Sequence, residues 1–222
     1  MRAMARSLAL LLGLMLCSQL WAADRLKVEG YPLDNGLQLI LKPTAERGHV
    51  SIRLVVGVGF DQFDCDQKEL PHLLEHLLFS GIDASGEAGL EERMQALGGD
   101  WNAFTRDSDT TFVLEVPAAN QRAALDLLLA AMFNTEFTPE RVEAAKRVIV
   151  HENGEHPAAW QRLLGASSKR NDATEQVAAE LGQACAEQDS LDRLDAATLE
   201  RVHEQWYVAN NMTLIMVGDL DR

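Results

Sequence analysis

The feature that most constrains this chain is an apolar stretch that carries two histidines and a glutamate in its midst. Residues 68–81 read KELPHLLEHLLFSG and place His72, Glu75 and His76 in the order H-x-x-E-H. On a helix, residues four apart lie about 40° apart around the axis, so both imidazoles project from one face. The surrounding leucines and Phe79 predict a helix that is buried nearly all round. Ionisable groups on such a helix are costly unless a metal ion or a partner compensates them.

The spacing of the two histidines is the one that zinc requires. Imidazoles four residues apart on a helix can bind the same ion. Glu75 leans toward the same side and is placed to take a proton from a metal-bound water without binding the metal itself. The order inverts the commoner H-E-x-x-H zinc motif. Two histidines and one glutamate within five residues also occur by chance, so the interpretation depends on the rest of the chain.

The first 23 residues predict a cleaved secretory signal peptide. Arg2 and Arg6 precede a short apolar run, LALLLGLML, and small residues follow at Ala22 and Ala23. The run is too short to span a bilayer, and no later segment is long and apolar enough to do so. We therefore expect residues 24–222 to form a single domain that is periplasmic or secreted, with no membrane span after signal cleavage.

The charge of the chain excludes two classes of partner, and its cysteines allow a disulfide. The whole chain has a net charge of −14, and the signal peptide removes only basic residues, so the mature chain is more acidic still. An acidic surface argues against binding to nucleic acid or to anionic membranes. Cys65 and Cys185 follow the signal peptide. An exported protein can pair two such cysteines, although the sequence does not show whether they approach each other.

The hydrophobic pattern predicts a mixed fold with hairpins first. We expect strands at 26–33, 37–41, 50–58, 101–105, 110–116 and 212–217, and helices around the histidine motif and at 90–97, 120–132, 138–152, 158–165, 174–186 and 197–206. Asp66, Asn120 and Thr138 are expected N-caps, and Pro71 is tolerable only in a first helical turn. The prediction is an α+β fold, with a mainly antiparallel sheet of about six strands and helices packed on one face.

A third metal ligand is needed, and the residues alone do not identify it. Catalytic zinc sites usually have three protein ligands and keep one position for water. On or near the helix that starts at Thr138, the chain offers Glu143, His151, Glu152, Glu155 and His156. Each of these residue types is more often a solvated surface group than a ligand.

In its motifs and their separations, the chain resembles the insulinase/pitrilysin family of zinc peptidases, which includes mitochondrial processing peptidase. Members combine H-x-x-E-H with a glutamate about 76 residues after the second histidine, commonly in a stretch such as V-I-x-x-E. Counting from His76 leads to Glu152, within VIVHE at 148–152. Further matching landmarks are DNGL at 34–37, LGG at 97–99, NAFT at 102–105 and NM at 211–212 before VGD at 217–219. The similarity runs from about Leu33 to Asp219.

The resemblance implies a zinc-dependent endopeptidase with a mitochondrial processing peptidase-like fold and one Zn²⁺ per chain. His72, His76 and Glu152 would bind the metal, and Glu75 would activate the water. The segment that comprises Asn102, Ala103, Phe104 and Thr105 would be an edge strand that holds an extended peptide substrate by adding it to the sheet. For Trp101 and Phe104, plain core packing is the competing interpretation.

Three departures from the family pattern qualify this expectation. Members often carry another glutamate seven residues before the ligand, where this chain has Ala145, so its support of the metal ligands would be missing. The stretch after Pro157 has no recognisable family pattern until about Ala196. Active members use two such domains that close over the substrate, so a homodimer or a second peptidase-family chain is expected as partner. The alternative is a non-catalytic substrate-binding or assembly subunit of a paired peptidase.

Overall fold

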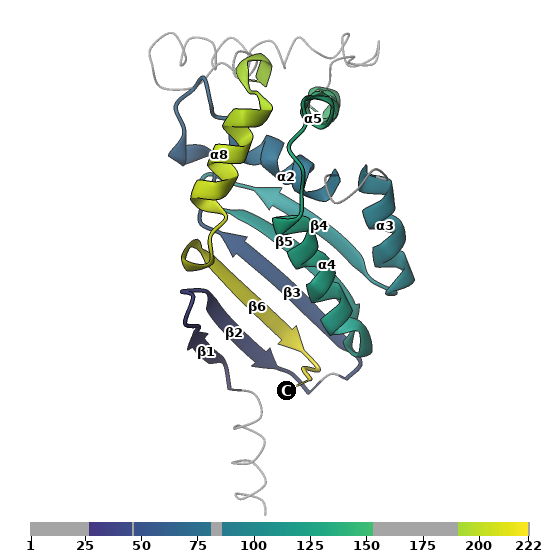
Figure 1. The fold of residues 1–222 in the computed structure, drawn as a ribbon. Coiled ribbons are helices and arrows are strands. Elements are labelled where there is room, and N and C mark those ends of the chain that lie inside the picture. The colour runs from purple at the N-terminus through teal and green to yellow at the C-terminus, as the bar shows by residue number, and fades with distance from the viewer. Residues whose placement is uncertain (1–26, 46, 81–85, 153–190, 222) are drawn as a thin grey trace, which may run out of the picture.

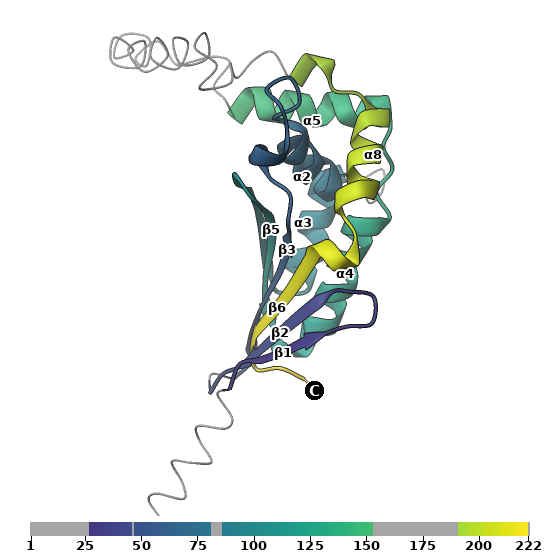
Figure 2. The same cartoon turned by 90° about the vertical axis from the view of Figure 1, so that its left-hand side faces the viewer.

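A computed structural model describes residues 27–45, 47–80, 86–152 and 191–221. In this part of the chain, a six-stranded sheet is covered by helices on one face (Figures 1 and 2). The strands are β1 (Glu29–Pro32), β2 (Gln38–Pro43), β3 (His49–Val56), β4 (Asp100–Thr105), β5 (Thr110–Pro117) and β6 (Met212–Gly218). Their spatial order is β1-β2-β6-β3-β5-β4, and every pair is antiparallel except β2–β6. The predicted α+β class and the mainly antiparallel sheet are confirmed.

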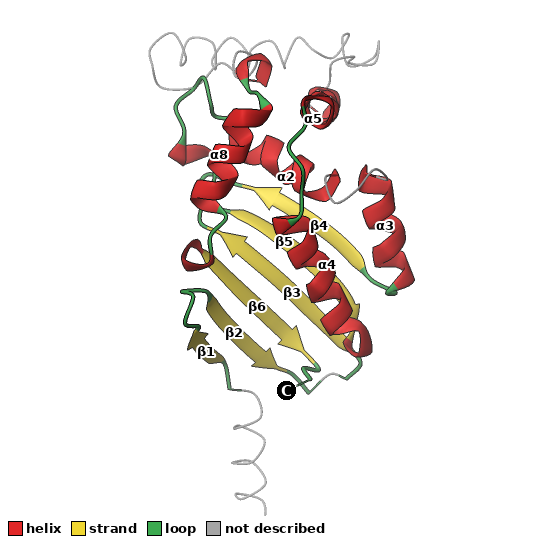
Figure 3. Ribbon diagram, viewed as in Figure 1, coloured by secondary structure: helices red, strands yellow, loops and turns green. Residues whose placement is uncertain are grey.

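The helices form a second layer that packs on one face of the sheet. Figure 3 shows the helices in red and the strands in yellow. They are α2 (Leu70–Ser80), α3 (Gly86–Ala96), α4 (Gln121–Phe133), α5 (Pro139–Glu152) and α8 (Ala196–Trp206). Short 3₁₀ turns lie at Phe60–Gln62, Ala118–Asn120, Leu191–Arg193 and Ala209–Asn211. None of the helices in the described ranges has the length and hydropathy that a membrane span requires.

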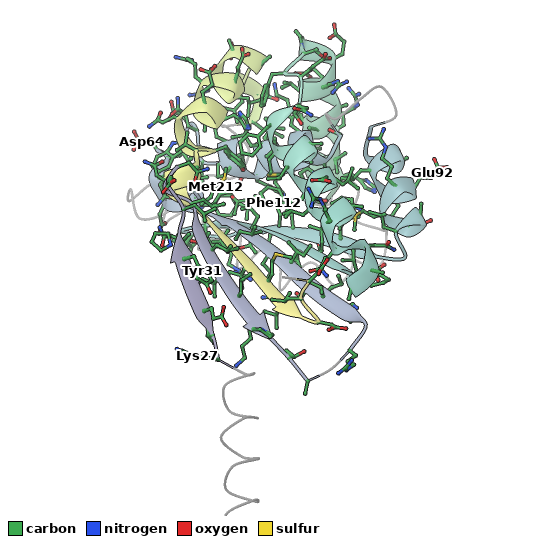
Figure 4. The ribbon with its side chains drawn as sticks, turned by 60° about the horizontal axis from the view of Figure 1, so that its bottom comes forward. Lys27, Tyr31, Asp64, Glu92, Phe112 and Met212 are labelled. Atoms are coloured by element: carbon green, nitrogen blue, oxygen red, sulfur yellow. The ribbon has the colours of Figure 1, made fainter. Side chains whose placement is uncertain are left out.

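Strand β3 shows how the sequence pattern builds the core. Val50, Ile52, Leu54 and Val56 are buried, whereas the residues between them are exposed or half-buried. Because alternate side chains of a strand point to opposite faces, these four face the helices. Phe112 of β5 (Figure 4) takes the same side. It packs edge-on against the ring of Phe79, with 5.3 Å between the ring centroids. Burial of this strand face anchors the helical layer.

The first hairpin has the predicted Asn-Gly turn. Gly36 has a φ of +92°, a conformation that favours glycine, and its N–H donates to Leu33 O over 2.9 Å. The Asn35 side chain accepts from Leu37 N–H at 3.1 Å. The turn also needs room, because a Cβ at Gly36 would come within 2.7 Å of Asn210 Cβ. The turn therefore fixes the β1–β2 register and its approach to the segment before β6.

Several predicted element ends and caps were wrong. The helix with the histidine motif begins at Leu70, and not just after Asp66; Pro71 does lie in its first turn. Strand β1 begins at Glu29, and α3 begins at Gly86, four residues before the predicted start. Asn120 precedes α4 but makes no side-chain cap; its amide donates to Leu97 O instead.

Other predictions agree with the structure or lie beyond its described residues. The Thr138 hydroxyl lies at the start of α5 and accepts from Arg141 N–H at 3.4 Å. The signal peptide at 1–23 and the helices expected at 158–165 and 174–186 lie outside the described ranges. Cys65 is disulfide-bonded; Cys185, whose approach to Cys65 the sequence left open, also lies outside the described ranges.

Gly59 allows the loop before α2 to approach the β4–β5 turn. Phe60 N–H donates to Arg106 O at 2.9 Å, and Asp61 N–H donates to Asp107 O at 2.8 Å. The backbone of Gly59 is extended, so conformation is no obstacle to other residues. Space is the obstacle, because a Cβ there would clash with Arg106 O and lie 2.7 Å from Asp107 O.

We predict that Gly59→Ala lowers the free energy of unfolding by about 1–3 kcal/mol, because rigid backbone atoms must move to admit the methyl group. Urea unfolding followed by circular dichroism measures this change. Gly30→Ala is the matched control, because a Cβ at Gly30 meets nothing within 4 Å. Equal stability of the two variants would contradict the prediction.

Candidate metal centre

Helix α2 presents its three ionisable residues from an otherwise apolar surface. Its leucines and Phe79 are buried in the core. Glu75 is 9% exposed, whereas the side chains of His72 and His76 retain 22% and 15% exposure. Because the helix is held by its apolar residues, the direction of both imidazoles is set by core packing.

Glu152 reaches the histidines from a second helix. Val142, Ala145 and Ile149 of α5 recur every three or four residues and are buried, and α5 packs against α2. This packing brings the last residue of α5 to the histidine pair, where α2 and α5 lie together at one end of the sheet (Figures 1 and 2). Glu152 Oε2 lies 3.5 Å from His72 Nε2 and 3.3 Å from His76 Nε2.

The three side chains form a donor set that fits zinc. The two Nε2 atoms are 3.2 Å apart, and the possible ligand atoms of His72, His76 and Glu152 all lie within 4.8 Å of one another. Two imidazoles and one carboxylate are a common catalytic zinc set, with a fourth position left for water. Within the described residues, this is the one group of histidine, cysteine and acidic side chains placed to hold a metal ion.

The other candidate ligands do not join this group. His151 is exposed and is not part of the group, and the Glu143 carboxylate accepts from Lys146 Nζ at 2.9 Å. Glu155 and His156 lie outside the described residues. Ala145 is 3% exposed and packs in the apolar core.

Glu75 lies beside the group without being one of its members. Its Oε2 accepts from the Thr105 hydroxyl at 2.6 Å, so the end of β4 holds the carboxylate in place. Burial raises the pKa of Glu75 above its ordinary value of 4.5, while the Thr105 hydrogen bond and the charge of His72 offset part of this shift. A raised pKa makes a carboxylate a better proton acceptor, which suits it to receive a proton and return it.

His72 is held on the side away from Glu152. Its Nδ1 lies 3.2 Å from Glu69 Oε2, and the Phe60 ring meets its ring edge-on, with centroids 6.4 Å apart. Burial lowers the pKa of His72, but the hydrogen bond with Glu69 and the charges of Glu75 and Glu152 outweigh it and raise the pKa above 6.5. Sequence reasoning missed both contacts, although a glutamate three residues before a histidine on a helix is a recognisable signal.

A cavity of about 360 Å³ opens over these residues. Its wall includes Phe60, Phe79, Trp101 and the four residues from Asn102 to Thr105, together with His72, Glu75, His76 and Glu152. Residues Asn102 to Thr105 belong to β4, which is an edge strand of the sheet. The predicted substrate segment therefore borders the same cavity as the candidate metal ligands.

Two details of β4 bear on the predicted peptide site. The Ala103 N–H donates to the Asn102 side chain at 2.8 Å, so an added strand would have to displace that amide oxygen to use this donor. Trp101 is half-buried and packs on Phe79, with ring centroids 3.8 Å apart, which fits the core interpretation. Phe104 is 43% exposed, so core packing does not explain it.

Comparison with known proteins identifies the family. A family model described as "Insulinase (Peptidase family M16)" matches residues 39–185, more than half of the chain. The chain belongs to the insulinase family of peptidases. A probable zinc protease PqqL of Haemophilus influenzae is 31% identical over 202 residues, which cover 85% of this chain and 21% of that protein. A probable mitochondrial-processing peptidase subunit beta of Arabidopsis thaliana is 30% identical over 121 residues, which cover 54% of this chain and 23% of that protein.

Solved structures show the same fold in this family. The periplasmic protease PqqL from Escherichia coli matches 88% of this chain over 22% of its own chain, with a TM-score of 0.70 and 24% identity. An M16 peptidase inactive domain from Pseudomonas fluorescens matches 89% of this chain over 48% of its own chain, with a TM-score of 0.69 and 17% identity. This insulinase-family chain thus spans about a fifth of the length of PqqL.

We predict that Glu75→Gln stabilises the metal-free protein at pH 7. The unfolded chain ionises this carboxyl above its ordinary pKa of 4.5, whereas the folded chain must bury the charge or bind a proton. A pKa that is higher in the folded state than in the unfolded state therefore lowers the stability, and this cost grows as the pH rises. Glutamine removes this cost and still accepts from Thr105. Urea unfolding in chelator should show a gain at pH 7 that shrinks toward pH 4.5.

Glu92→Gln is the control for this measurement, because Glu92 is exposed on α3 (Figure 4). It should change stability little at either pH. A Glu75→Gln protein no more stable than the wild type at pH 7 would contradict the assigned burial of charge.

Proposed function

We propose that this chain is the catalytic domain of a zinc-dependent endopeptidase that hydrolyses extended peptides. The observation that supports this most is the convergence of His72, His76 and Glu152 from two helices, with Glu75 beside them. One zinc ion per chain would be held by these three ligands. When bound, it lowers the pKa of water and polarises the carbonyl of the bond to be cleaved.

The residues of the chain itself divide the remaining work. Glu75 would accept a proton from the attacking water and return it to the leaving amine, as a general base and then a general acid. The Thr105 hydroxyl fixes the direction of that carboxylate through its 2.6 Å hydrogen bond. Asn102, Ala103, Phe104 and Thr105 border the cavity on an edge strand, where an extended peptide can add to the sheet through main-chain hydrogen bonds.

The enzyme would be periplasmic or secreted, as the N-terminal signal predicts. A second domain, from a homodimer or from another peptidase-family chain, would complete the substrate site. This part of the proposal rests on the paired domains of the peptidase family to which the chain belongs.

The alternative is a non-catalytic substrate-binding or assembly subunit of a paired peptidase. Ala145 favours it, because the chain lacks the second glutamate that members often carry near the metal. Four metal-site residues at working separations favour the catalytic assignment, because a domain that only binds does not need them.

We predict that Glu75→Gln keeps zinc but lowers peptide cleavage by about 10²–10⁴-fold, the usual contribution of a general base. His76→Ala and Glu152→Ala should lose zinc as well as activity. Metal content by mass spectrometry and cleavage of fluorogenic peptides, with and without candidate partner chains, measure both effects. Glu143→Gln, on the same helix as Glu152 but outside the ligand group, is the control for loss of an α5 carboxylate.

Zinc binding without any Glu75-dependent cleavage, even with partner chains present, would refute the endopeptidase. A stable complex with an active partner peptidase, whose activity His72→Ala leaves unchanged, would favour the binding subunit instead.

A further inference from the structure

Glu69 touches the candidate metal site but has no role in the function proposed above. It lies immediately before α2, where its carbonyl accepts from Leu73 N–H at 2.9 Å. Its carboxylate turns toward His72 and lies 3.2 Å from Nδ1. Both partners are largely shielded from water, with side-chain exposures of 15% for Glu69 and 22% for His72.

The two nitrogens of His72 therefore face different groups. Nδ1 faces Glu69, whereas Nε2 lies 3.2 Å from His76 Nε2 and 3.5 Å from Glu152 Oε2. An imidazole binds a metal through the nitrogen that carries no proton, and the hydrogen bond of the other nitrogen sets which one that is. With Nδ1–H donating to a carboxylate, the Nε2 lone pair is left for the metal.

We propose that Glu69 is a positioning residue that fixes the tautomer and ring orientation of His72 for zinc. This proposal rests on the zinc site of the proposed function, but not on peptide cleavage. Phe60 limits the ring from another direction, so the carboxylate and the aromatic edge together restrict its rotation. Partners of this kind make a ligand more basic and hold it in place before the metal arrives.

The position of Glu69 also bears on the missing glutamate at residue 145. The buried Ala145 leaves helix α5 without a carboxylate there. Glu69 instead supplies one from the position immediately before α2, the helix that carries the two histidines. Ligand and supporting group are then three residues apart in the chain, and their contact does not depend on how α2 packs against α5.

A simpler role is possible for a glutamate at this place, because negative charge near a helix N-terminus stabilises the helix. Aspartate separates the two roles. Glu69→Asp keeps the charge at the helix start but shortens the side chain, so it no longer reaches Nδ1. Glu69→Gln keeps the reach and a neutral acceptor, while Glu69→Ala removes both.

The test measures zinc affinity by competition with a chromogenic chelator in the purified mature chain. We expect Glu69→Ala and Glu69→Asp to weaken zinc binding by about 10–100-fold and Glu69→Gln to weaken it less. In the metal-free protein, ¹⁵N shifts of His72 should indicate a proton on Nδ1 in the wild type and a shift toward Nε2–H in the alanine and aspartate variants.

Glu115→Ala is the matched control, because Glu115 Oε2 lies 2.8 Å from His49 Nε2, and neither residue belongs to the metal-site group. It should leave zinc affinity unchanged. The proposal would be overturned if Glu69→Ala and Glu69→Asp both kept the zinc affinity of the wild type and its ¹⁵N chemical shifts at His72. Zinc binding is measured without substrate, so the two proposals can fail separately. A protein that cleaves no peptide but shows the expected affinity changes would refute the endopeptidase function and support the positioning role of Glu69.

Discussion

The structure depends on a conflict between burial and charge in helix α2. The helix must bury its leucines to hold the layer of helices on the sheet, and this brings Glu75 and two histidines out of water. Each of these groups is met by a particular partner. Thr105 donates to Glu75, Glu69 lies at His72, and Glu152 approaches both imidazoles. The partners come from β4, from the start of α2 and from α5, so the site holds together three separate parts of the fold.

Partial compensation is what makes such a site chemically useful. Burial still outweighs the hydrogen bond of Thr105, so the carboxyl of Glu75 keeps a raised pKa. Two imidazole nitrogens 3.2 Å apart also remain close to one carboxylate oxygen. A divalent cation at the proposed site would satisfy these lone pairs together, which no single side chain in the group can do. Metal binding would thereby return the stability that the metal-free protein gives up.

Local features of the sequence predicted local features of the structure. Pro71 placed the first turn of α2, Asn35-Gly36 placed the first hairpin, and the apolar run at 50–58 located strand β3. Spacing along one helix also sufficed to bring His72 and His76 together. Glu152 required the family resemblance, because its meeting with the histidines depends on the packing of two helices about 76 residues apart in sequence. Residue types gave no reason to prefer it over its neighbours.

The sequence patterns did not predict which strands pair over a long range or which side chains contact His72. Asp66 looked like the natural N-cap, but the helix begins later and Glu69 takes the place beside His72. Nothing in the sequence indicated that Phe60 contacts His72, because the position of Phe60 follows from the close approach of Gly59 to the β4–β5 turn. The place of β6 between β2 and β3 was equally invisible, since apolar periodicity identifies a strand but not its neighbours.

That central place of β6 has a consequence for how the protein folds. The β1–β2 hairpin and the β3–β5–β4 unit share no strand pairing of their own, and β6 joins them. Each unit can form its local pairs early, but a continuous sheet must wait for β6, at residues 212–218, to join them. Until then, β2 and β3 both present unpaired edges. The folding chain therefore passes through a period in which it is open to mispairing, and a chaperone would protect it most during that interval.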